Sequence, residues 1–93
     1  MQIPDEFYDF CRYLHQDSMM VYGPNIEDVI SGALEHMDTA HRSVLRKFIG
    51  HLLAGGYSDD ELQAIYRTTD AEIGIRNDKG IRHFLAMVRD AIA

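Results

Sequence analysis

The chain has one cysteine, Cys11, and no apolar run that approaches the roughly 20 residues needed to cross a bilayer. A lone cysteine cannot form a disulfide within the chain. Met1 is followed by Gln2, Asp5 and Glu6 rather than by a basic stretch and an apolar segment, so the sequence predicts no signal peptide. These absences favour a cytoplasmic protein that has no membrane partner.

Basic side chains are scarce in the first part of the chain. Residues 1–41 carry Arg12 as the one basic side chain against eight acidic ones, a formal charge of −7. Residues 42–93 carry eight basic and seven acidic side chains, a formal charge of +1. A negative field of this kind repels nucleic-acid phosphates and accelerates the encounter with a basic protein. We therefore expect a basic protein partner and no nucleic-acid partner.

Internal repeats and low-complexity tracts are also missing, so nothing divides the chain into domains. A hydrophobic content of 46% with 26% charged residues fits a folded globular protein. A chain of this length buries only roughly 60–65% of its unfolded surface, so every helix must contribute to one shared core. We expect a single domain over residues 1–93. No sequence feature sets an oligomeric state.

Apolar residues recur at helical spacing near the start of the chain. The first stripe, at i, i+3, i+4 and i+7, consists of Phe7, Phe10, Cys11 and Leu14. It predicts a helix from about Pro4 to Gln16. Asn25 follows a Gly-Pro break and is a suitable cap for a second helix, whose apolar face extends to Met37.

A third helix is predicted in the middle of the chain, capped by Asp38 or Thr39 and running to about Ala54. Gly55-Gly56 stops it. Its apolar stripe is predicted to cover nearly half of the helix circumference and consists of Val44, Leu45, Phe48, Ile49, Leu52 and Leu53. We therefore expect this helix to lie at the centre of the fold.

The last part of the chain predicts two further helices. Ser58 and Glu61 match a capping box, so we expect a short fourth helix that ends near Thr68. Residues 70–80 show no helical stripe and are predicted to form a loop. A final stripe predicts a fifth helix over about residues 80–91. Five amphipathic helices joined by short loops predict an all-α fold, a single compact irregular bundle.

Histidine and acidic side chains raise the hypothesis of a metal site, because imidazole and carboxylate are common zinc and iron ligands. The candidate ligands are His15, Asp17, His36 and His41. Their spacing matches no helical metal motif, so we expect His15 to hydrogen-bond at a helix end and His36 to lie near the surface. A small metal-dependent enzyme or sensor that uses His15, Asp17 and either His36 or His41 stays open as an alternative.

The sequence contains no recognisable catalytic motif. Cys11 falls on the apolar stripe of the first predicted helix, where a thiol is buried and protonated rather than nucleophilic. A serine-centred elbow, a phosphate-binding loop and a paired-carboxylate motif are all missing. We expect no enzymatic activity and no cofactor.

Aromatic and methionine side chains gather in the first part of the chain, a composition that is enriched at the centres of protein interfaces. The residues are Tyr8, Tyr13, Met19, Met20 and Tyr22. Two interpretations stay open. These side chains form a binding hot spot surrounded by acidic residues, or Tyr22 and one methionine pack beneath the loop between the first two helices.

The motif His15-Gln16-Asp17 closes the aromatic-rich first helix, and an acidic helix beginning Ile26-Glu27-Asp28 follows. With the leucine-rich third helix, the short fourth helix and a terminal helix containing Phe84-Leu85, nearly the whole chain resembles the immunity proteins of bacterial contact-dependent growth inhibition systems. The resemblance implies a cytoplasmic helical protein that binds and neutralises a toxin domain delivered by a neighbouring cell. Many such toxins are nucleases, whose basic active-site regions suit an acidic partner.

We expect the toxin to be bound by the first two helices and the loop between them. The predicted contact residues are Asp5, Asp9, Asp17, Tyr22, Asp28 and Glu35. For His15, Gln16 and Asp17 we favour a structural role, in which their side chains tie the end of the first helix to the following loop. Direct contact of this motif with the toxin is the alternative. A helical adaptor for an unrelated basic protein is a further alternative function.

Overall fold

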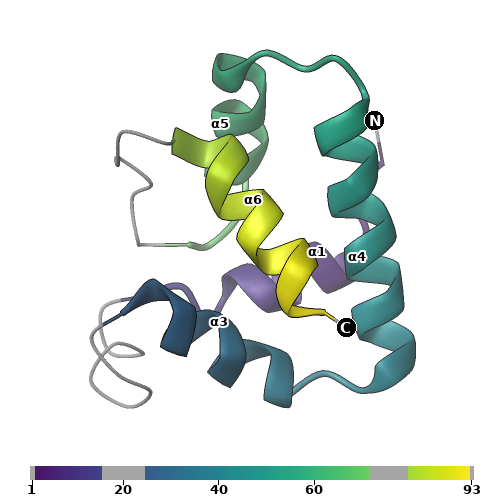
Figure 1. The fold of residues 1–93 in the computed structure, drawn as a ribbon, viewed down its shortest axis with the longest axis vertical. Helices are drawn as coiled ribbons and strands as arrows, with labels where there is room; N and C mark the ends of the chain where they lie inside the picture. Colours follow the sequence, from purple (N-terminus) through teal and green to yellow (C-terminus); the bar gives the residue numbers. More distant parts are fainter. Residues whose placement is uncertain (1, 16–24, 72–79, 93) are drawn as a thin grey trace.

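The structure, a computed structural model, describes residues 2–15, 25–71 and 80–92 of the chain. Within these residues the regular elements are the helices α1 (Asp5–Cys11), α3 (Ile26–Glu35), α4 (Thr39–Ala54), α5 (Asp59–Arg67) and α6 (Gly80–Ala91) (Figure 1). The predicted all-α fold is confirmed. No helix in this part of the chain is both long enough and apolar enough to cross a membrane.

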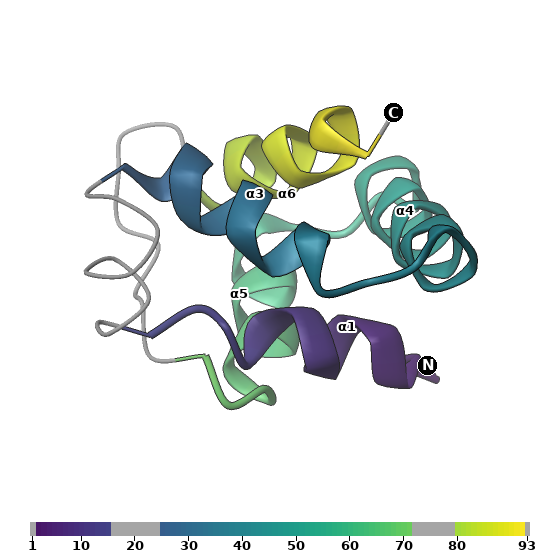
Figure 2. The same cartoon turned by 90° about the horizontal axis from the view of Figure 1, so that it is seen from below.

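Helix α6 runs across the middle of the molecule and packs against α3, α4 and α5 (Figure 1). Helix α1 packs against α4. Figure 2 shows that α1 and α3 run in opposite directions, so the start of α1 lies at the same end of the molecule as the end of α3. The result is an irregular arrangement of helices that cross at different angles.

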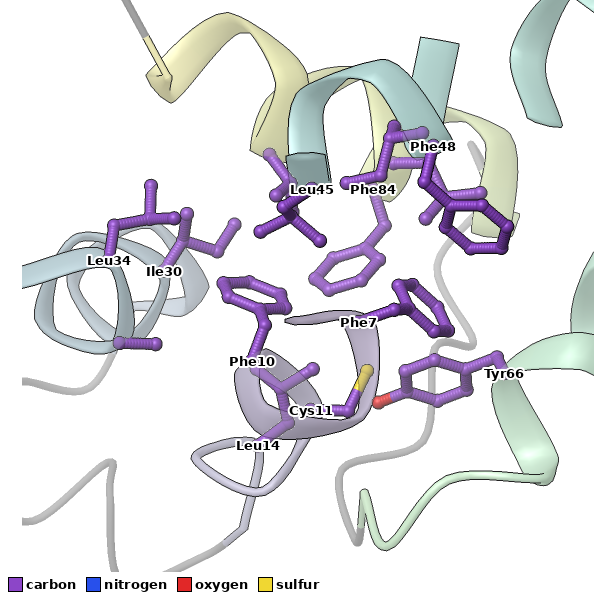
Figure 3. Packing of buried hydrophobic residues seen from close by; sticks show 14 of the residues in the cluster. Phe7, Phe10, Cys11, Leu14, Ile30, Leu34, Leu45, Phe48, Tyr66 and Phe84 are labelled. Atoms are coloured by element: carbon purple, nitrogen blue, oxygen red, sulfur yellow. The ribbon is translucent and has the colours of Figure 1, made fainter. Parts of the chain in front are cut away.

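The core lies where α1 meets the other helices, and aromatic rings fill much of it (Figure 3). The ring of Phe7 meets the ring of Phe48 edge-on, with centroids 5.1 Å apart. The rings of Tyr66 and Phe84 make a second edge-on contact at 5.9 Å. Burying one such side chain stabilises the fold by roughly 1.5–3 kcal/mol. Both short helices, α1 and α5, are therefore held mainly by their buried faces rather than by helix propensity.

The predicted caps are confirmed at two helices. The Asp38 carboxylate accepts a hydrogen bond from the backbone N–H of His41 at 2.8 Å. At the start of α5, Ser58 Oγ accepts from the Glu61 N–H at 3.1 Å and Glu61 Oε1 accepts from the Ser58 N–H at 3.0 Å. Asn25 occupies the predicted cap position of α3, but its side chain accepts no cap hydrogen bond there.

One predicted boundary and one predicted core position are wrong. The first helix ends at Cys11 rather than at Gln16, because the backbone N–H groups of Tyr13 and Leu14 bond to carbonyls three residues back, at 3.2 and 3.0 Å. These tighter turns still bury Leu14 completely. The side chain of Val44 is 39% exposed, because α1 and α6 cover less of the α4 surface than its apolar stripe spans. Of the predicted loop, residues 72–79 lie outside the described part of the chain.

Helices α5 and α6 are joined by a polar contact that the sequence did not indicate. The Arg82 guanidinium donates to the Tyr57 carbonyl at 2.5 Å and to the Asp59 carboxylate at 3.3 Å. Helix α6 begins at Gly80 with a φ of +70°, a backbone conformation that side chains with a Cβ rarely adopt. Helix α6 starts beside α5 and crosses the core (Figure 1).

Candidate functional site

The structure places four of the six predicted toxin contacts, and all four side chains are exposed. Asp5 and Asp9 lie on α1, and Asp28 and Glu35 lie on α3. We call these four residues the acidic face. The acidic face is divided between two helices, which run in opposite directions (Figure 2). Asp17 and Tyr22, the other two predicted contacts, lie outside the described residues.

Among the described residues, three of these four carboxylates have no basic partner at ion-pair distance. In the described part of the chain, no basic nitrogen lies within 4.0 Å of Asp5, Asp28 or Glu35. Asp9 differs, because its Oδ1 lies 3.4 Å from Arg12 Nη1. Both partners of that pair are exposed, so water and salt screen it and it contributes little stability. The acidic face therefore keeps most of its negative charge.

An open depression lies between the end of α1 and the corner where α3 passes into α4, with a volume of about 470 Å³. We call it the ring groove, and its lining residues are Asp9, Arg12, Tyr13, His36, Met37 and His41. The Tyr13 ring stacks on the His36 imidazole with centroids 4.8 Å apart and planes only 4° from parallel. This stack joins the segment after α1 to the segment after α3 and gives the groove a flat aromatic wall.

His41 links α1 to the start of α4 beside the ring groove. Its Nδ1 lies 2.9 Å from the Asp38 carboxylate, and its Nε2 lies 4.0 Å from the carboxylate of Glu6. The backbone hydrogen bond from His41 lowers the pKa of Asp38, so this carboxylate stays ionised at neutral pH. The imidazole therefore lies between two acidic side chains, one on each helix.

The predicted metal alternative requires side chains that converge. Across residues 2–15, 25–71 and 80–92, no group of three or more His, Cys, Asp or Glu side chains is arranged to hold a metal ion. His36 and His41 do share the ring groove, where one stacks on Tyr13 and the other lies beside Asp38. Asp17, the acidic member of the alternative set, lies outside these residues.

The motif His15-Gln16-Asp17 is described only at its first residue. His15 is partly buried and directly follows Leu14, which is fully buried in the core. Gln16 and Asp17 lie outside the described residues. The structural role of the motif therefore stays a prediction.

Cys11 is completely buried beside Tyr66, as the sequence predicts (Figure 3). Burial raises the pKa of the thiol to about 12, and a hydrogen bond with the Thr69 side chain offsets part of that effect. The thiol is therefore protonated near neutral pH. A group in this state serves packing and is a poor nucleophile.

The ring groove was only partly visible in the sequence. The tyrosine-rich composition of the first helix pointed to Tyr13, and ligand chemistry pointed to His36 and His41. The sequence did not identify Arg12 and Met37 as lining residues. Arg12 has the pattern of an ordinary surface residue, and Met37 has the pattern of an ordinary residue on the apolar face of a helix. A clustering of aromatic, histidine and methionine side chains close to helix ends was the available signal.

Comparison with protein-family models, with curated proteins and with solved structures finds no match. The function must therefore be argued from the residues of this chain.

Proposed function

We propose that this protein is a non-enzymatic immunity protein, which binds and neutralises a basic toxin domain of a contact-dependent growth inhibition system. The observation that carries the proposal is the acidic face, where three exposed carboxylates lack a basic neighbour among the described residues. The resemblance of the sequence to the immunity proteins supplies the identity of the partner. A nuclease is the expected toxin, because its substrate-binding surface must attract phosphate.

The charge distribution favours a basic partner over other classes. The charge of −7 belongs to residues 1–41, the part of the chain that contains α1 and α3. Opposite charges on two protein surfaces raise the association rate, and like charges suppress wrong partners. Rim carboxylates such as Asp28 and Glu35 would therefore mainly set how fast the complex forms and how it responds to salt.

The ring groove supplies a second element that the acidic face lacks, a place for tight packing. The stacked rings of Tyr13 and His36 line the groove together with Met37, which is largely buried in the core. An arginine or lysine side chain of a partner gains about 0.5–1 kcal/mol from lying over such a ring at an exposed site. Interface hot spots are enriched in tyrosine, so we assign the slow dissociation of the complex to this groove.

Charge reversal tests the role of the acidic face. The variants are Asp28→Lys and Glu35→Lys, and the partner is the toxin domain that the unchanged protein binds in a panel of purified toxin domains of contact-dependent growth inhibition systems. Each reversal should lower the association rate at low salt about tenfold and weaken its salt dependence, because long-range attraction is lost. Asp60→Lys is the matched control, since Asp60 is an exposed acid in the first turn of α5 as Asp28 is in α3. It should leave the association rate nearly unchanged.

Removal of a ring tests the role of the groove. Tyr13→Ala should raise the dissociation rate with little change in the association rate. Tyr57→Ala is its control, because Tyr57 is also partly buried and contacts a histidine ring, His51, at 6.1 Å. If the purified protein forms no complex with any toxin domain of the panel and leaves their activity intact, the immunity function is wrong. If a complex forms but the paired variants behave alike, the assignment of the surface is wrong.

A further inference from the structure

A second depression lies on another side of α4, where the first half of that helix meets the end of α6, and its volume is about 290 Å³. We call it the arginine pocket, and its lining residues are Thr39, Arg42, Ser43, Arg46 and Ile92. The four α4 residues follow one another at i, i+3, i+4 and i+7, so they share one face of the helix. Two guanidinium groups and two hydroxyl groups therefore open into one small space.

Within the described residues, the two arginines of this pocket differ from three other arginines, which lie close to a carboxylate. Arg12, Arg82 and Arg89 each lie within 4.0 Å of a carboxylate. Across the described residues, no carboxylate lies within that distance of Arg42 or Arg46. Asp38 is the acidic residue nearest to Thr39 in sequence, and its carboxylate is occupied by the backbone N–H and the imidazole of His41.

An independent observation concerns Arg42, whose Nε is buried and has no hydrogen-bond partner. It is the only buried side-chain nitrogen or oxygen without a partner among the residues that the structure describes. Buried polar groups are almost always paired, and an unpaired donor on a charged group is costly. A small turn of the flexible Arg42 side chain would let this N–H reach an acceptor placed in the pocket. The missing component is therefore an oxygen acceptor that carries negative charge.

We propose that the arginine pocket binds a small phosphate dianion, either free phosphate or the phosphate group of a small phosphomonoester. Two positive charges match a dianion better than they match a single carboxylate, and guanidinium N–H groups form charge-assisted bonds to phosphate oxygens. The hydroxyls of Thr39 and Ser43 supply two further donors for a tetrahedral group. The net charge of −6 disfavours long polyanions such as nucleic acids, so the ligand is small.

The test is a titration of the whole protein with inorganic phosphate at constant ionic strength, followed by amide chemical shifts. Phosphate should cause saturable shifts in residues 39–46 and at Ile92. Arg42→Gln and Arg46→Gln should each weaken binding at least about tenfold, since each removes one charge from the pocket. Lys47→Gln is the matched control, because it removes a positive charge from the same helix at a residue that does not line the pocket. This variant should bind phosphate as the unchanged protein does.

Further titrations distinguish the ligands. Saturation by phosphoserine or adenosine monophosphate at lower concentration than inorganic phosphate would identify a phosphomonoester, and the reverse order would identify free phosphate. Acetate should cause no saturable shift. Equal binding of acetate, the absence of saturation with every phosphate compound, or equal weakening by Lys47→Gln would overturn the proposal. If Arg42→Gln unfolds the protein, the exposed Arg46 decides the outcome alone. No toxin enters this experiment, so its result is separate from that of the immunity function.

Discussion

The thiol of Cys11 should make the folded protein lose stability in alkaline solution. Burial raises its pKa from the ordinary value of 9.0 to about 12. Between these two values the folded state holds a proton that the unfolded state releases. Stability from this group is therefore complete below about pH 9 and falls as the pH rises toward about 12.

The size of the effect follows from the two pKa values. At about pH 10 the unfolded thiol is mostly ionised and the folded thiol is almost entirely protonated. Linkage then gives a loss of about 1.4 kcal/mol in the free energy of unfolding, relative to neutral pH. The loss hardly depends on the exact folded value, because any folded pKa above about 11 keeps the folded thiol protonated at this pH.

Urea unfolding at about pH 7.5 and about pH 10 in the presence of a reductant measures this effect. Cys11→Ala and Cys11→Ser both remove the ionisable group, and they differ in how well they fill its site. Tyr66 and the other titrating groups stay in all three proteins. The pKa of Tyr66 is raised chiefly by burial, which all three proteins share, and secondly by Cys11, so its contribution largely cancels in the comparison. The unchanged protein should lose about 1.4 kcal/mol more than either variant. Equal losses in the three proteins would refute the reasoning.

Four further substitutions test the local structure by urea unfolding. Ser58→Ala should lower the free energy of unfolding by about 1 kcal/mol, because the backbone N–H of Glu61 loses the Ser58 Oγ acceptor. An unchanged free energy of unfolding would show that this cap contributes no stability. Phe10→Ala should lower it by about 3–5 kcal/mol by leaving a cavity in the core, and a loss under about 1 kcal/mol would contradict the packing. Gly50→Ala, in the middle of α4 with open space at the Cβ position, should raise it by about 0.5–1 kcal/mol. Gly56→Ala should lower it because the φ there is +77°. A fall for Gly50→Ala or a rise for Gly56→Ala would contradict the corresponding prediction.

The features that the sequence predicted best are those decided by neighbouring residues. A cap such as Ser58 or Asp38 bonds to an N–H three residues ahead, so the sequence contains both partners. The end of α1 was predicted poorly because it does not depend on neighbouring residues alone. Apolar spacing alone does not separate an α-helix from the tighter turns that bury Leu14, and the surrounding helices decide between them.

The sequence likewise predicted one part of the candidate site and missed the others. The exposure of the acidic face could be predicted, because its residues lie opposite an apolar stripe on each helix. The ring groove could not, since the stacking of Tyr13 on His36 depends on tertiary packing that brings the segment after α1 to the segment after α3. The arginine pocket was missed because Arg42 and Arg46 read as ordinary solvated positions until the end of α6 is placed beside them.

The central position of α6 has a consequence for how the chain folds. The partners of α6 lie on three earlier helices, so its contacts join residues that are far apart in sequence. During synthesis the apolar faces of α3, α4 and α5 emerge before the helix that covers them. Folding is then governed by closure of the whole chain rather than by pairing of successive helices, and it should be slower than in a simple up-and-down bundle of equal size. Until α6 is made, the nascent chain exposes the surfaces that favour aggregation.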